Sequence, residues 1–255
     1  MNRRRFLGAA GVAGLGALAG CSGAVGSVAP PSVPEDVLSE GGWTKTDEST
    51  ETVFEQSYGP VTVTAKSTVV AYEDEALAAD VSEKTLGKIE GTLAIYSASH
   101  INFSPDLNNL PGGVGRAELL SEVESAAESQ FEQRMRGSGL ENVTKTGETE
   151  FETDSGATPG ITTFTAEYPV GTLEYEAGGE AFTIEGGTIE VAGDLAVWNA
   201  GDYVVVAGGA YPGENFATTT EQSLSEAITV SVDIDLGLTP DEYEEEVRGL
   251  MAATE

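Results

Sequence analysis

The chain has one cysteine, Cys21, and one histidine, His100, which limits the nucleophilic and metal chemistry open to it. A Ser-His-Asp or Cys-His catalytic system could use only His100, which lies in the strand-like run Ser97–Ile101. No G-x-S-x-G motif presents a serine nucleophile. We therefore expect a structural role for His100 and name no catalytic residue.

Cys21 stands just after a short apolar segment near the N-terminus. Arg3, Arg4 and Arg5 precede an uncharged run, Phe6–Ala19, of 14 residues. A membrane-spanning helix needs about 20 apolar residues, so this run is short for one. A basic start, a short apolar run and small residues after it are typical of a secretory signal peptide. We expect residues 1–20 to be such a peptide.

Two motifs in this segment resemble known signals. The export motif consists of Arg3, Arg4, Phe6 and Leu7, and the lipidation motif consists of Leu18, Ala19, Gly20 and Cys21. The first resembles the twin-arginine export signal, and the second resembles the lipobox of lipoprotein precursors. The resemblance implies cleavage before Cys21 and a diacylglyceryl group on its thiol. It places the domain outside the cell, lipid-anchored on the outer face of the cytoplasmic membrane. An uncleaved N-terminal anchor and a free buried cysteine are the alternatives.

The chain is strongly acidic. It carries 43 acidic and 12 basic residues, a formal charge of −31, and loss of residues 1–20 with their three arginines would leave −34. Such a charge repels phosphate groups, so we exclude nucleic acid as a partner. A hydrophobic content of 40% favours a folded domain over a disordered one. The acid-rich, lysine-poor composition resembles that of proteins from extreme halophiles.

Other candidate sites have less support in the sequence. Zinc sites need three or four cysteine, histidine or acidic ligands, so we expect none, and we expect no cofactor. No D-x-[DN]-x-[DN]-G loop occurs, although the many carboxylates leave a calcium or magnesium site open. Two N-x-[ST] sequons, at Asn102 and Asn142, are candidates for N-glycosylation on an exported protein.

The hydrophobic pattern predicts an α+β fold. Alternating residues predict strands over 43–56, 61–72 and 89–103. Apolar residues at helical spacing predict a long helix over 116–137, and Thr239-Pro240 begins a C-terminal helix. Residues 140–236 favour an antiparallel meander, with a hairpin turn at Gly186-Gly187. Because β-α-β-α alternation is absent, we expect a meander-rich antiparallel sheet packed by these two helices.

The composition divides the chain into three parts. We expect a signal peptide over residues 1–20, the lipid-attachment cysteine and a flexible linker over 21–34, and one α+β ectodomain over 35–255. From Arg116 onward, the element order and the stretch GDYVVVAGGAYP loosely resemble the Mog1/PsbP-like arrangement. The whole chain is similar to uncharacterised haloarchaeal lipoproteins, through residues 3–21 and composition. That resemblance implies a location and no activity.

These features favour a non-enzymatic binding or interaction domain at the cell surface. Its partner, besides the membrane that holds the lipid, would be an unknown envelope protein or a small ligand. One alternative is an extracellular hydrolase that uses two carboxylates in a cleft, at least one of them with a raised pKa. A second alternative is the solute-binding component of a transporter, a class that usually has two α/β lobes.

Overall fold

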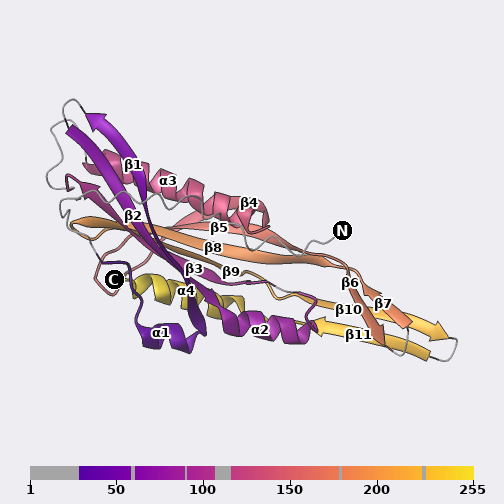
Figure 1. Cartoon of the computed structure of the whole chain (residues 1–255). Coiled ribbons are helices and arrows are strands. Elements are labelled where there is room, and N and C mark those ends of the chain that lie inside the picture. The colour runs from indigo at the N-terminus through magenta and orange to yellow at the C-terminus, as the bar shows by residue number, and fades with distance from the viewer. Residues whose placement is uncertain (1–28, 59–60, 90, 107–115, 178–179, 226–227) are drawn as a thin grey trace, which may run out of the picture.

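The computed structural model describes the chain from residue 29 onward, apart from four short gaps and single residue 90. The described residues are 29–58, 61–89, 91–106, 116–177, 180–225 and 228–255. They form one large antiparallel sheet, two small hairpins and four helices (Figure 1). The α+β class, the antiparallel sheet and the C-terminal helix predicted from the sequence are confirmed.

The main sheet has seven strands in the order β1-β2-β3-β9-β8-β5-β4, and all neighbouring strands are antiparallel. The strands are β1 (Trp43–Tyr58), β2 (Val61–Asp74), β3 (Ile95–Ser104), β4 (Glu141–Glu150), β5 (Gly160–Val170), β8 (Gly187–Asn199) and β9 (Tyr203–Pro212). The central strand is β9, and its alternate residues pack on opposite faces. Val204 packs with Leu119, whereas Val205 packs in the cluster that contains Val247. A strand covered on both faces explains the continuous apolar run in its sequence.

Helices cover both faces of the sheet (Figure 1). On one face lies α3 (Arg116–Gly137), which has the bounds predicted from its apolar stripe. On the other face lie α1 (Glu35–Glu40), α2 (Glu75–Lys84) and α4 (Pro240–Ala252). Helix α4 buries its apolar stripe against β3 and β9, because Val247, Leu250 and Met251 pack in one cluster with Tyr96.

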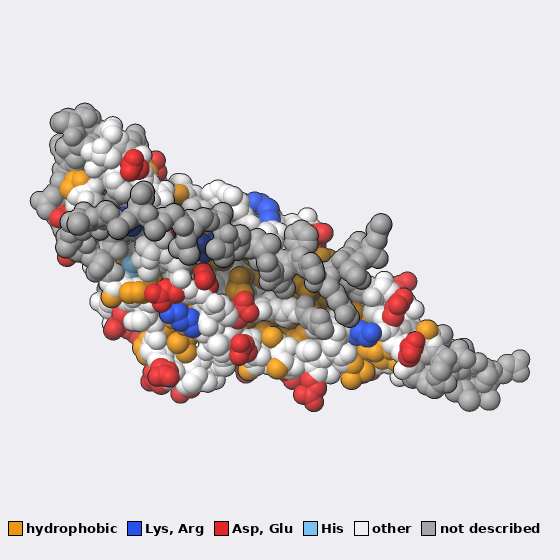
Figure 2. Space-filling view, viewed as in Figure 1, with side chains coloured by type: hydrophobic (Ala, Val, Ile, Leu, Met, Phe, Trp, Pro, Cys, Tyr) orange, Lys and Arg blue, Asp and Glu red, His pale blue; other side chains and the backbone are white. Residues whose placement is uncertain are grey.

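The surface reflects the acidic composition. Figure 2 shows many aspartate and glutamate side chains spread over one face, with few lysine and arginine side chains among them. On this face the acidic side chains are spread out rather than gathered in one patch. Among the described residues, no helix is both long enough and apolar enough to cross a membrane.

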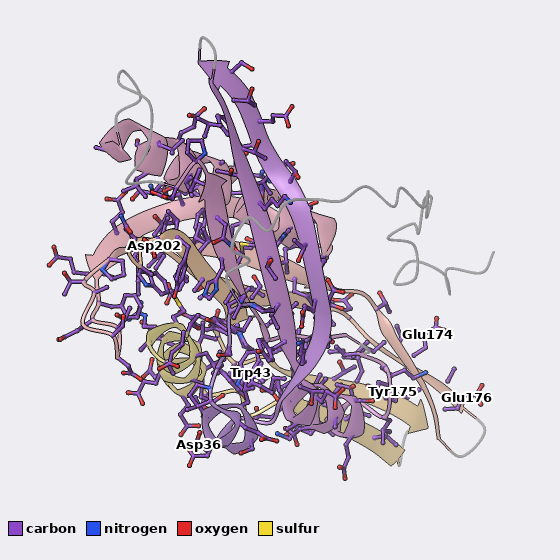
Figure 3. All side chains as sticks on the ribbon, turned by 60° about the vertical axis from the view of Figure 1, so that its left-hand side comes forward. Asp36, Trp43, Glu174, Tyr175, Glu176 and Asp202 are labelled. Atoms are coloured by element: carbon purple, nitrogen blue, oxygen red, sulfur yellow. The ribbon has the colours of Figure 1, made fainter. Side chains whose placement is uncertain are left out.

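Two hairpins project together from one end of the sheet (Figure 1). They are formed by β6 (Leu173–Ala177) with β7 (Glu180–Ile184), and by β10 (Ala217–Ser225) with β11 (Ile228–Asp235). Figure 3 shows Tyr175 on the first hairpin between Glu174 and Glu176. The Tyr175 hydroxyl donates a hydrogen bond to the Thr85 carbonyl, 3.1 Å away, which ties this hairpin to the end of α2.

The predicted hairpin at Gly186-Gly187 is wrong. Strand β7 pairs with β6, and β8, which begins at Gly187, pairs with β5 and β9. Gly186 is instead the point at which the chain returns from the projecting hairpin to the main sheet. A Cβ atom there would lie 1.9 Å from the Val170 carbonyl oxygen, so glycine serves a close backbone approach and not a turn.

The first described residues lie against the domain. Ser32 and Glu255 exchange two backbone hydrogen bonds, with N···O distances of 2.8 and 2.9 Å. Val33 is buried in the core cluster. Residues 29–34, which the sequence assigned to the linker, are therefore packed beside the C-terminus.

Candidate functional site

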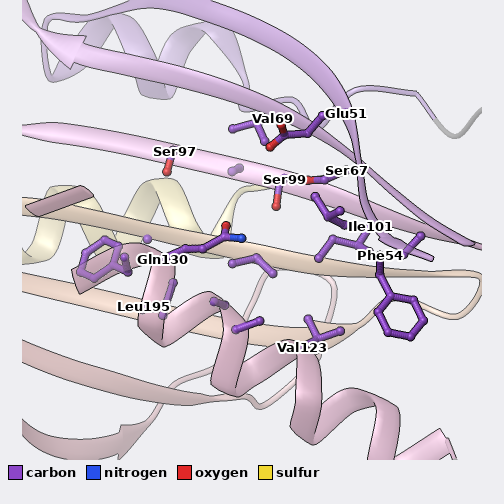
Figure 4. A pocket seen from close by; sticks show the side chains of 18 of the residues that line it. Glu51, Phe54, Ser67, Val69, Ser97, Ser99, Ile101, Val123, Gln130 and Leu195 are labelled. Carbon is purple, nitrogen blue, oxygen red and sulfur yellow. The ribbon is translucent and has the colours of Figure 1, made fainter. Parts of the chain in front are cut away.

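A pocket of about 190 Å³ lies between α3 and the main sheet (Figure 4). Helix α3 forms its roof with residues from Leu119 to Arg134 that follow the i, i+3, i+4, i+7 pattern of one helix face. Strands β1, β2, β3, β8 and β9 form its floor. Apolar pockets with a few polar groups are the usual form of small-molecule sites, so this pocket is the candidate functional site.

The floor is hollow because its central side chains are small. The inward-facing residues there include Ala65, Ser67, Ser97, Ser99 and Gly208. Antiparallel pairing brings these residues together. Ser97 lies opposite Gly208 on β9, and Ser67 lies opposite Ile101, two residues before Val69 on β2. Larger side chains at these positions would fill the space beneath the helix.

Large side chains at both ends of the pocket-facing row of α3 keep the helix away from the sheet. Phe131 packs on Phe164, with ring centroids 5.2 Å apart, and on the glycine at position 193, where a Cβ atom would come within 3.0 Å of its ring. Leu119 is buried at the other end. Between these anchors the stripe carries Ala126 and Ala127, whose short side chains leave the gap open.

Three serine side chains line this pocket. Within the part of the chain that the structure describes, the side chains of Ser67, Ser97 and Ser99 make no hydrogen bond. Figure 4 shows Ser67 and Ser99 side by side on the floor and Ser97 further along β3. Ser67 and Ser99 are also almost fully buried, at 4% and 8% exposure. Hydroxyl groups that line the pocket and make no bond to the described residues are suited to a ligand or to water there.

Charged side chains lie at the rim. Arg134 is exposed near the C-terminal end of α3, and Glu122 lies near its N-terminal end. Glu51 reaches the pocket from the edge strand β1. The rim therefore has a cation at one end and carboxylates elsewhere, while the interior is lined mainly by apolar side chains with a few serine hydroxyls.

A second polar group lies on the opposite face of the sheet. Asp194, 1% exposed, accepts a hydrogen bond from Arg248 Nε at 2.8 Å and one from the Tyr211 hydroxyl at 3.2 Å. Arg248 also pairs with Glu244 on the same helix. Burial and the neighbouring Asp194 charge raise the pKa of Tyr211. These contacts fix α4 on β8 and β9, which is a structural task.

Two further carboxyl groups near α4 have raised pKa values. Burial is the main cause at both Asp74 and Glu246, and the Asp74 charge raises the pKa of Glu246 further. Asp74 accepts the Leu77 N–H at 2.8 Å and so caps α2. The Glu246 Oε2 atom is buried without a hydrogen bond among the described residues. Neither residue lines the pocket beneath α3.

His100 holds the N-terminal segment in place. Its Nδ1 atom lies 2.8 Å from the Ala29 carbonyl oxygen, and its ring packs on Tyr203 with centroids 4.4 Å apart. Burial lowers the pKa of His100, which favours the neutral imidazole that can donate from Nδ1. These contacts give His100 a structural role.

The residues predicted for export and lipid attachment lie outside the described part of the chain, which begins at residue 29. They are Arg3, Arg4, Phe6, Leu7, Leu18, Ala19, Gly20 and Cys21. Of the sequons, Asn142 is exposed and its Nδ2 donates to Glu167 Oε2 at 2.8 Å, while Asn102 is half-buried on β3. Glycosylation stays a prediction. Among the described residues, no group of three or more histidine, cysteine or acidic side chains is arranged to hold a metal ion.

The pocket was not predicted from the sequence. One signal was present, because the apolar stripe of α3 has two adjacent alanines at its middle and large residues toward its ends. A second signal was the small residues on alternate positions of β2 and β3, such as Ser67 and Ser99. Only the cross-strand pairing shows that these two signals meet.

The fold and the pocket define a class of protein, an antiparallel sheet with helices on both faces and an apolar cavity beneath one of them. The chain belongs to the family described as "Domain of unknown function (DUF6517)", which matches residues 30–255. No curated protein and no solved structure matched the chain.

Proposed function

We propose that this protein is a lipid-anchored envelope protein that binds the apolar part of a small ligand beneath α3. The observation that carries the binding function is the pocket of about 190 Å³ between a helix and a floor of small residues. A well-packed domain has few voids larger than a water molecule, so a cavity of this size at one helix is a distinct feature.

The size of the pocket sets the size of the bound group. An apolar cavity of about 150 Å³ holds benzene, so 190 Å³ takes about six to nine carbon atoms. Each CH₂ group that leaves water contributes about 0.8 kcal/mol to binding. A ligand that places a short alkyl segment here gains affinity from burial, and the serine hydroxyls can bond to any polar atom it carries.

The anchor and the location rest on the sequence motifs at residues 3–7 and 18–21. These motifs resemble twin-arginine and lipobox signals, and the composition resembles that of haloarchaeal lipoproteins. Extraction from membranes of the native host, followed by mass measurement of the N-terminal peptide, tests this part. A diacylglyceryl group on Cys21 supports it, and an unmodified N-terminus at residue 1 contradicts it.

The two alternatives receive less support from the structure. A carboxylate hydrolase needs two acids that face a cleft, but the pair with raised pKa values, Asp74 and Glu246, lies away from the pocket. A solute receptor usually has two α/β lobes, but the described residues centre on one antiparallel sheet.

Isothermal titration of 1-octanol into the full-length chain tests the binding function, in about 2 M KCl to screen the charge. We expect saturable binding to the wild-type chain. Ala127→Leu adds three carbon atoms to the roof and should abolish binding. Ala117→Leu is the matched control, because Ala117 is exposed on the same helix and does not line the pocket.

Circular dichroism and thermal unfolding will show that each variant is folded. If Ala127→Leu does not fold, Ser99→Leu fills the pocket from the floor instead. Octanol that fails to bind the wild-type chain, or that binds both filled variants as tightly as the wild-type chain, contradicts the proposal.

A further inference from the structure

The two ends of the pocket differ in their lining. This difference indicates the class of ligand, which the proposed function does not specify. Its floor consists of successive rows of cross-strand neighbours along β3. The first row contains Ser97 and Gly208, and the last contains Phe103 and Ala65. Phe103 lies six positions after Ser97, so the rows of lining residues extend about 20 Å along β3. An elongated lining of this kind suits a single chain better than a fused ring.

The chemistry of the lining changes along this length. Phe54 and Ile101 lie at one end with Val123, whereas Gln130 and Ser97 lie toward the other, where they accompany the apolar side chains of Leu195 and Phe131 (Figure 4). Arg134 follows Gln130 by one turn of α3, so its guanidinium group extends the polar end. One end of the pocket is thus suited to an alkyl tail and the other to a polar head.

Arg134 makes no ion pair with any residue that the structure describes, although the chain has 43 acidic and 12 basic residues. The residues three and four positions away are Gln130, Phe131 and Gly137 on α3 and Ser138 just after it. By contrast, Arg136 pairs with Glu132 at 2.8 Å on the same helix. Glu122 lies twelve residues before Arg134, about 18 Å along the helix.

A free guanidinium group beside an apolar cavity has a defined ligand preference. Its planar set of donors matches the two oxygens of a carboxylate or a phosphate, and it can bond to both at once. The carboxylates Glu51 and Glu122, which also line the pocket, repel an anion from the rest of the rim. An anionic head is therefore favoured at Arg134.

We infer that the pocket binds a single-chain amphiphile with an anionic oxyacid head, with the head on Arg134 and the first carbons of the tail between α3 and the sheet. This inference rests on the proposed function. It adds the class of ligand and its orientation, which places the tail toward Phe54 and Phe103.

Three eight-carbon probes with different heads test the inference by isothermal titration into the full-length chain at neutral pH. They are octanoate, 1-octanol and octyltrimethylammonium. We expect octanoate to bind about threefold to tenfold more tightly than octanol, as suits a charge-assisted pair at an exposed rim. The cationic probe should bind most weakly.

Arg134→Gln should reduce octanoate affinity to that of octanol and leave octanol affinity unchanged. Lys66→Gln is the matched control. Lys66 also lacks an ion pair among the described residues, it is exposed, and it does not line the pocket. This control removes the same charge from the chain, so octanoate affinity should stay within twofold of the wild-type value.

The possible results test the pocket as a binding site and the anionic head on Arg134 separately. Failure of all three probes contradicts the pocket as a binding site. Equal affinity for octanol and octanoate, unaffected by Arg134→Gln, overturns the anionic head and keeps the pocket. Tighter binding of octyltrimethylammonium would assign the head to Glu51 or Glu122 and overturn the orientation. If Lys66→Gln lost as much octanoate affinity as Arg134→Gln, the loss would be explained by the net charge of the chain and not by a contact with Arg134.

Discussion

Glu246 is a half-buried acid on α4 with one oxygen that lacks a hydrogen bond among the described residues. Burial raises its pKa and the nearby charges of Asp74 and Glu242 raise it further, while the nearby indole N–H of Trp43 partly opposes this shift. The folded state therefore holds this proton more tightly than the unfolded chain does. Stability from Glu246 is greatest at low pH and is lost as pH rises from the unfolded pKa through the raised folded pKa.

Glu246→Gln removes this ionisation, so we expect the variant to be more stable than the wild-type chain at pH 7. The difference should shrink on acidification and vanish below about pH 4, where the glutamate is protonated in both states. Urea unfolding at several pH values in constant high salt measures it.

Glu245→Gln is the control for this experiment, because Glu245 is the exposed neighbour and its loss changes the net charge equally. Its stability curve should follow that of the wild-type chain. A Glu246→Gln variant that is less stable at pH 7, or whose pH profile matches the wild-type profile, would show that Glu246 is stabilised by a contact it must keep.

At the scale of the elements, Gly186 sets the path from the projecting hairpin to strand β8. A Cβ atom on this residue would lie 1.9 Å from the Val170 carbonyl oxygen and 2.5 Å from that of Gly171. These carbonyl groups lie at the end of β5, and Gly186 directly precedes β8. Neither side of the contact can move away without shifting one of these strands. We expect Gly186→Ala to lower the free energy of unfolding by about 1 to 3 kcal/mol, measured by urea unfolding.

A glycine in open space should respond in the opposite way. Gly249 lies in α4, and a Cβ atom there would meet nothing within 4 Å. Gly249→Ala should therefore stabilise the chain by about 0.5 kcal/mol through helix propensity. Equal effects of the two substitutions would mean that Gly186 is not constrained by its contacts.

The elements differ in how far the sequence predicts them. Helix α3 was predicted with its observed bounds, because its stripe and Gly137 are local signals. The turn at Gly186-Gly187 was predicted wrongly, because the contact with Val170 that requires glycine is not local. The pocket depends on the pairing of five strands with one helix, so no single segment contains the information that specifies it.

At the scale of the whole molecule, like charge is the dominant electrostatic feature. The formal charge is −31, and the visible acidic side chains are spread over many elements (Figure 2). Raising salt shortens the Debye length from about 10 Å at 0.1 M to about 3 Å at 1 M, which reduces their mutual repulsion. We expect Tm to rise steeply with KCl up to about 1 M and to level off above it.

Differential scanning calorimetry in KCl measures this dependence. Sucrose is the control, because it stabilises folded proteins by exclusion from their surface and does not screen charge. A Tm that is constant or falls with KCl would contradict self-repulsion as the factor that limits stability. If sucrose at low ionic strength raised Tm as much as KCl does, the stabilisation would be attributed to exclusion of the solute from the protein surface.

The pairing of Ser32 with Glu255 also determines how far the domain can travel. If Cys21 carries the proposed lipid, residues 22–28 are the stretch between it and Ala29, which His100 holds against the domain. Eight Cα–Cα steps of at most about 3.5 Å give a reach of about 28 Å, roughly the thickness of the hydrocarbon layer. Under the proposed anchoring, the domain would stay within about that distance of the membrane, and its ligand would have to reach it there.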